Sequence, residues 1–159
     1  MDAMNQPEAN RYLESLGDDL SLALGRAIWS FSVIESATFE YLKKLSTEPL
    51  HELMVDQLFK ARLKLVFKLV ERIDGFESEK KKAKGYLDRA EKLAKIRNAI
   101  AHNPWRVWAD FDLRELQAEI QPPRVNAESY SLATVRQFTV DAQEISSGLF
   151  EALRSLPQV

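Results

Sequence analysis

The sequence contains no cysteine, only two histidines and only five glycines among its 159 residues. The lack of cysteine excludes disulfide bonds and thiolate zinc sites, and it favours a reducing compartment. The two histidines, His51 and His102, are far apart in the sequence, so we expect no metal ion. The sequence has no glycine-rich phosphate loop, and we predict no bound cofactor.

Long hydrophobic runs and a strong excess of one charge are also missing. No apolar run approaches the roughly 20 residues that span a bilayer, and residues 1–7 lack the basic and apolar regions of a signal peptide. The net charge of −2 argues against a general polyanion binder, so affinity for nucleic acid would require a local patch. We expect one soluble, cytoplasmic domain over residues 1–159, with no membrane partner.

Hydrophobic periodicity predicts four helices, over about 18–45, 47–73, 78–102 and 132–156. Asp18 or Asp19 is the expected cap of the first helix, and residues 1–12 are expected to be loose. The first helix is predicted to bury Leu20, Leu24, Ala27, Phe31, Ile34, Thr38, Leu42 and Leu45. The second is predicted to bury Leu50, Met54, Leu58, Ala61, Leu65, Leu69 and Ile73. The fourth is predicted to bury Val135, Phe138, Ala142, Ile145, Leu149 and Leu153.

The segment 105–128 differs from the rest, because it combines short-range alternation with two adjacent prolines. It predicts a small β-hairpin or an irregular flap between the third and fourth helices. The expected fold is therefore all-α: a four-helix up-down bundle with that flap.

The richest stretch of the sequence is 96–105, at the end of the third helix. Pro104 disfavours helical geometry at Asn103, so the helix is expected to end near His102. At about 100° per residue, Arg97 points along the centre of an apolar stripe, and Asn98 and His102 lie one turn apart on its flank. A guanidinium in such a place is costly unless it is paired.

Residues 80–102 form the one strongly basic element of the chain, with eight Lys and Arg against Asp88 and Glu91. One interpretation is a solvated, salt-bridged helix face. The other is an electrostatic footprint for phosphate, with Lys92 and Lys95 leading toward Arg97.

Arg97 and His102 suit phosphodiester chemistry. Arg97 would stabilise developing charge, His102 would transfer a proton and Asn98 would orient the imidazole or bind a phosphate oxygen. Partial negative charge at a helix C-terminus favours the imidazolium, and the 2′-hydroxyl of RNA supplies a nucleophile without a metal. Alternatively, His102 only caps its helix and Asn98 only begins a turn.

The pattern Arg97-Asn98-x-x-x-His102 within a helical bundle resembles the HEPN superfamily, in which an Arg is followed by His after four to six residues. The resemblance implies a metal-independent endoribonuclease, often a toxin or phage-defence component with an antitoxin or companion protein. It also implies a homodimer in which two motifs form a composite cleft, with Arg97 and His102 as the catalytic pair and Asn98 as their polar neighbour. Other members of the family keep the fold without catalysis and bind nucleotides or proteins.

Three further residues complete the predicted site. Glu35 lies beside the apolar seam of the first helix and is the best candidate to pair with Arg97, although it could instead face solvent. Trp105 and Arg106 follow the motif, where they could stack on RNA bases or cover an edge of the core.

The leading hypothesis is a homodimeric, metal-independent endoribonuclease that acts on RNA. The alternatives are a non-catalytic module of the same fold, which binds a nucleotide or a protein, and a plain helical dimerisation protein.

Overall fold

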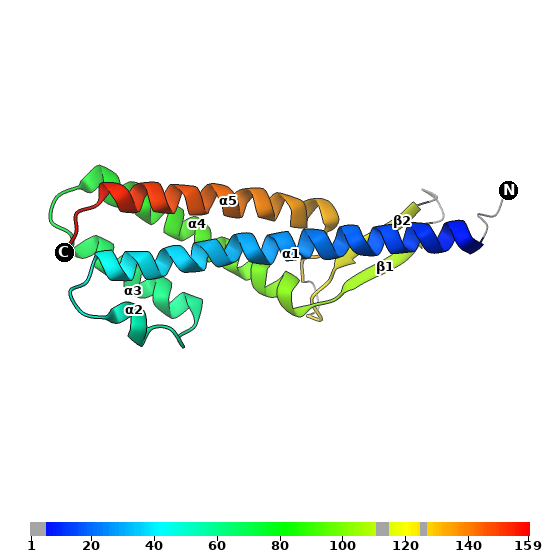
Figure 1. Cartoon of the computed structure of the whole chain (residues 1–159), viewed down its shortest axis with the longest axis horizontal. Coiled ribbons are helices and arrows are strands. Elements are labelled where there is room, and N and C mark those ends of the chain that lie inside the picture. Colours follow the sequence, from blue (N-terminus) through cyan, green and yellow to red (C-terminus); the bar gives the residue numbers. More distant parts are fainter. Residues whose placement is uncertain (1–5, 111–114, 125–126) are drawn as a thin grey trace.

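The computed structural model describes residues 6–110, 115–124 and 127–159, and this part of the chain is mostly helical. Its helices are α1 (Gln6–Lys44), α2 (Leu50–Leu53), α3 (Phe59–Arg72), α4 (Glu77–His102) and α5 (Leu132–Ser155), and its strands are β1 (Trp105–Asp110), β2 (Glu115–Ile120) and β3 (Tyr130–Ser131). Helices α1, α4 and α5 run side by side, and α3 packs against α1 and α4 (Figure 1). None of the described helices is both long and apolar enough to cross a membrane.

Helix α1 begins earlier than predicted. Asp18 and Asp19 lie inside it rather than at its cap, and residues 6–12 are helical rather than loose; residues 1–5 lie outside the described part of the chain. Pro7 lies in the first turn, where a backbone N–H has no carbonyl partner within the helix, so proline costs no hydrogen bond there. Residues 10–19 are exposed except for half-buried Leu16. Leu13, Leu16 and Leu20 recur at helical spacing, so the sequence does carry a short helical signal before Asp18 that the prediction did not use.

The predicted second helix is wrong in two respects. It divides into the short α2 and the longer α3, with turns and an extended Leu58 between them. The buried face of α3 is also different: it consists of Phe59, Arg62, Leu63, Val66 and Val70, whereas Leu58 is 81% exposed. Of the predicted face, Ile73 is buried, Leu50, Met54, Leu65 and Leu69 are partly buried against the core, and Ala61 is exposed. Lys60, Lys64 and Lys68 mark one polar side of α3, and the apolar side opposite is broad. The predicted stripe through Leu58, Ala61, Leu65 and Leu69 lies along the edge of that apolar side rather than at its centre.

The buried faces predicted for the first and fourth helices agree with the structure. The apolar face of α1 is buried, apart from partly buried Leu24, and the whole predicted face of α5 is buried. The two helices are also joined by the buried phenol of Tyr41, which donates a hydrogen bond to the carbonyl of Leu149 (2.9 Å). Next to it, Gly148 of α5 lies against the ring of Tyr86 of α4, where a Cβ atom would overlap the ring.

The segment after α4 forms a hairpin, as one of the two predicted alternatives stated. β1 pairs antiparallel with β2, with Trp105 opposite Ile120, and β2 pairs with the short β3. Ile120 and Tyr130 are buried, so this sheet closes the core beside the end of α4. The connection 111–114 lies outside the described residues.

Candidate functional site

The end of α4 places the predicted motif at a helix terminus. The helix ends at His102, and Asn103 is extended (φ −126°, ψ 140°) before Pro104, as predicted. The side-chain amide of Asn103 donates to the carbonyl of Ala99 (2.6 Å). Asn103 therefore satisfies one of the last carbonyls of the helix, and the side chain of His102 is exposed.

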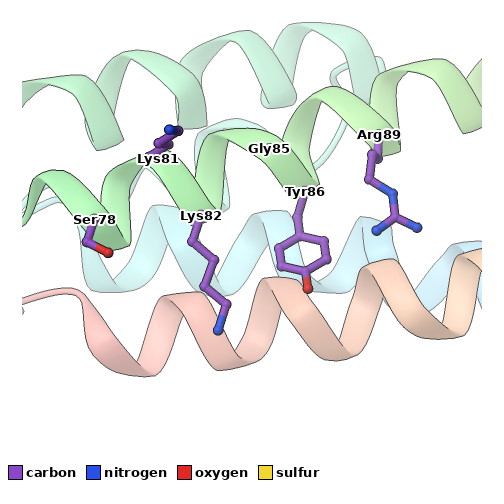
Figure 2. Close-up of a pocket in the computed structure, with 6 residues that line it drawn as sticks. All are labelled: Ser78, Lys81, Lys82, Gly85, Tyr86 and Arg89. Atoms are coloured by element: carbon purple, nitrogen blue, oxygen red, sulfur yellow. The ribbon is translucent and has the colours of Figure 1, made fainter.

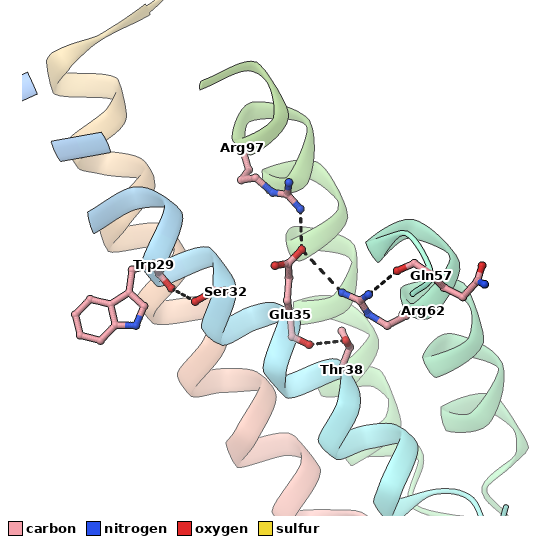
Figure 3. A network of polar contacts seen from close by, with 7 residues as sticks. All are labelled: Trp29, Ser32, Glu35, Thr38, Gln57, Arg62 and Arg97. Atoms are coloured by element: carbon pink, nitrogen blue, oxygen red, sulfur yellow. Dashed lines mark hydrogen bonds and ion pairs between the residues drawn. The ribbon is translucent and has the colours of Figure 1, made fainter. Parts of the chain in front are cut away.

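Arg97 makes the predicted contact with Glu35 of α1. Its Nη2 lies 2.7 Å from Glu35 Oε1, and the two side chains are 23% and 29% exposed. The guanidinium also lies over the ring of Phe31, 5.0 Å from its centroid. A second arginine, Arg62 of α3, reaches the same carboxylate oxygen at 3.9 Å (Figure 3). Glu35 is thus shared by two guanidinium groups and holds Arg97 across the helix interface.

A groove of about 520 Å³ opens between the start of α3 and the end of α4. Four predicted site residues line it together: Lys95, Arg97, Asn98 and His102. They are joined by Leu58, Phe59, Lys60, Leu63, Glu91 and Ala94. The structure therefore brings most of the predicted motif to one concave surface.

The lining of the groove is mixed in character. Lys60 of α3 and Lys95 and Arg97 of α4 supply positive charge against the single carboxylate of Glu91, while Leu58, Leu63 and Ala94 are apolar. A cleft lined mostly by one charge attracts ligands of the opposite sign. A ligand with both a phosphate and an apolar ring, as in a nucleotide, suits this lining.

The N-terminal part of the basic stretch is a salt-bridged surface. Lys82 lies 2.5 Å from Glu151 and Arg89 lies 2.7 Å from Glu144, both on α5. In Figure 2 Lys82, Tyr86 and Arg89 extend from α4 toward α5 around a shallow depression. The hydrogen bond to Glu151 raises the pKa of Lys82. Lys82 and Arg89 thus form ion pairs between α4 and α5. Only the last turns of α4 therefore stay candidates for the phosphate-binding footprint.

Three other predicted RNA contacts do not line the groove. Lys92 is exposed on α4, and Arg106 donates to the side chain of Gln121 (2.5 Å) within the hairpin. Trp105 is partly buried against the core, and its Nε1 has no hydrogen-bond partner among the described residues. For Trp105 the structure supports the alternative in which it covers an edge of the core.

Sequence reasoning missed Lys60 and Arg62. Lys60 gave no signal, because only the packing of α3 on α4 brings it to the groove. Arg62 could have been found: it follows Phe59 by three residues and precedes Val66 by four, so it is a charge on an apolar face. Like Arg97, Arg62 places a guanidinium on an apolar helix face, where it is costly unless it is paired.

The described residues contain no cluster of three or more His, Cys, Asp or Glu side chains that could hold a metal ion. No model of a known protein family matches this chain, and no curated protein or solved structure matches it either. The case for a function therefore depends on the groove itself.

Proposed function

We propose that this chain is a HEPN-like, metal-independent endoribonuclease that acts as a cytoplasmic homodimer. The observation that carries the proposal is the groove in which Arg97, Asn98 and His102 meet two lysines, with Arg97 held by Glu35. On this view α1, α3, α4 and α5 are the four helices of an up-down bundle, and α2 is a short insertion.

The proposed reaction uses the RNA's own nucleophile. The 2′-hydroxyl loses its proton and attacks the adjacent phosphorus, the bond to the 5′-oxygen breaks, and that oxygen takes up a proton. The products are a 2′,3′-cyclic phosphate and a 5′-hydroxyl. Arg97 stabilises charge on the phosphoryl oxygens, and Lys60 and Lys95 attract the neighbouring backbone.

A dimer supplies the two proton transfers that this reaction needs. Each subunit has one His102, so one imidazole can act as the base and the partner's as the acid. Asn98 lies four residues before His102 on the same helix face, where it can orient the imidazole or bind a phosphate oxygen.

A second candidate, a non-catalytic module that binds a nucleotide or a protein partner, is favoured by one observation. Arg97 already has a carboxylate partner and an aromatic ring beneath its guanidinium, which is how a structural arginine is stabilised. On this view the groove binds its ligand without cleaving it.

Cleavage and binding assays on matched variants separate the two candidates. The chain offers a control within itself, because His51 is its other histidine, lies on α2 and does not line the groove. In EDTA, we expect wild type and His51→Ala to cleave a mixed RNA substrate, and His102→Ala to be slower by about 10²-fold or more. Arg97→Lys keeps the positive charge but loses the planar guanidinium with its paired N–H donors, so we expect this variant to cleave RNA slowly as well.

Equal cleavage by wild type and His102→Ala would contradict the nuclease proposal. Binding of a non-cleavable 2′-O-methyl oligoribonucleotide by wild type, with no cleavage of the RNA by any variant, would favour the binding module. Neither binding nor cleavage of either RNA would contradict an RNA ligand in the groove. If the protein is a toxin, expression of wild type but not of His102→Ala should arrest growth of the host, and an antitoxin or companion protein would relieve that arrest.

A further inference from the structure

Arg62 is the most deeply buried charged side chain near the groove. The residue is 7% exposed and lies on the inner face of α3. Arginine is rarely buried unless it is paired, and here the guanidinium lies over the ring of Phe39, 4.5 Å from its centroid. Its Nε has no hydrogen-bond partner among the described residues. Burying a guanidinium costs free energy that an apolar side chain such as methionine would not cost at the same position.

The guanidinium of Arg62 joins two parts of the site. On one side it lies 3.9 Å from the Glu35 oxygen that binds Arg97. On the other it donates to the backbone carbonyl of Gln57 (2.6 Å), directly before Leu58 at the edge of the groove (Figure 3). One side chain thus connects the carboxylate that orients Arg97 with the segment that brings Leu58 to the groove.

The charges in this cluster do not balance, because two guanidinium groups share one carboxylate. Burial lowers the pKa of Arg62; Glu35 raises it, and Arg97 lowers it further. Removal of Arg62 would leave Glu35 and Arg97 as a balanced pair. Replacing a whole buried ion cluster by well-packed apolar residues is often neutral or stabilising, so a buried ion cluster is weak evidence of a purely stabilising role.

We propose that Arg62 is a positioning residue for a phosphate-bearing ligand. It fixes Glu35 and the Gln57 carbonyl, and so holds Arg97 and the groove-lining Leu58 in place. The ligand in this statement rests on the function proposed above, whereas the effect of Arg62 on Arg97 does not. Arg62 itself does not line the groove, so it acts through these neighbours.

The test compares Arg62→Met and Arg62→Lys with Arg72→Met, a matched control at the exposed C-terminal end of the same helix. Two measurements are made on each: the Nε–Hε NMR resonance of Arg97 in the free protein, and the affinity for a fluorescent 2′-O-methyl oligoribonucleotide. The resonance is assigned with Arg97→Lys.

We expect Arg62→Met to fold with some loss of stability, since the Gln57 carbonyl loses its donor. It should also shift or broaden the Arg97 resonance and weaken binding about tenfold, as for members of one polar network. Arg62→Lys should recover part of that loss, since it restores the charge without the fork. Arg72→Met should change neither. In a Glu35→Gln background, Arg62→Met should have a smaller effect on the resonance.

Either of two results would overturn the proposal: an Arg97 resonance unchanged in the folded Arg62 variants, or an equal effect of Arg62→Met with and without Glu35. If Arg62→Met does not fold, Arg62→Lys decides the same question. If wild type does not bind the oligoribonucleotide, the RNA function fails, while the resonance still decides the role of Arg62.

Discussion

Replacing Glu35 by glutamine tests whether one carboxylate organises the cluster at the centre of the site. The amide keeps the shape of the side chain but removes the charge that Arg97 and Arg62 share. Two guanidinium groups then lie near each other without an anion. We therefore expect Glu35→Gln to destabilise the fold through electrostatics, with no change in packing volume.

The burial of the three side chains sets the magnitude. Breaking a fully buried pair costs about 3–5 kcal/mol, and an exposed pair contributes about 0–1 kcal/mol. The side chains of Glu35 and Arg97 are 29% and 23% exposed, and that of Arg62 is 8% exposed. The cluster falls between the two limits, so we predict a loss of about 2 kcal/mol and a fall in Tm of about 4–8 °C for a chain of this length.

Urea unfolding followed by circular dichroism measures this loss, and α1 provides the control. Glu40 forms an ion pair with Lys43 at 2.7 Å, the same distance as Glu35 to Arg97, but with side chains 43% and 48% exposed. Glu40→Gln should cost less than about 0.5 kcal/mol. Equal losses for the two variants would refute the idea that Glu35 is a buried organising charge.

Three further predictions concern the seams between the helices. Gly148→Ala should destabilise the fold by about 1 kcal/mol, because overlap of the new Cβ atom with the Tyr86 ring outweighs the better helix propensity of alanine. In a Tyr86→Ala background, thermal unfolding should show that Gly148→Ala raises stability instead. A loss of stability in that background would contradict the overlap. Tyr41→Phe should cost about 1 kcal/mol in urea unfolding, since it removes the buried bond to the Leu149 carbonyl; an unchanged midpoint would count against that bond. Burial raises the pKa of Tyr41, so above about pH 10 the unfolded state loses a proton that the folded state keeps, and stability falls as pH rises. A pH series of unfolding curves should show a smaller alkaline decrease for Tyr41→Phe than for wild type, and equal decreases would contradict the assignment.

Where one face of a helix is clearly apolar, the sequence was enough to predict the structure. The buried residues of α5, from Val135 to Leu153, recur at helical spacing between polar neighbours, and all are buried as predicted. The end of α4 followed from the steric effect of Pro104 on Asn103. The predictions failed in two places: residues 10–19 of α1 have almost no buried side chain, and the apolar side of α3 is broad, so the predicted stripe fell on its edge.

The site divides in the same way. Arg97, Asn98 and His102 share one helix, so their common location follows from helical spacing. Lys60 and Arg62 come to the site only through the packing of α3 against its neighbours, which the sequence does not specify. Glu35 was predicted to pair with Arg97 because a carboxylate beside an apolar seam needs a cation, and the structure provides that contact.

The chemical ends of RNA fragments, analysed by mass spectrometry after incubation in EDTA, test most directly whether Arg97 and His102 cleave RNA. We predict 2′,3′-cyclic phosphate and 5′-hydroxyl ends from wild type and His51→Ala, and no such fragments from His102→Ala. Fragments with 3′-hydroxyl ends, or the same fragments from His102→Ala, would contradict attack by the 2′-hydroxyl at this groove.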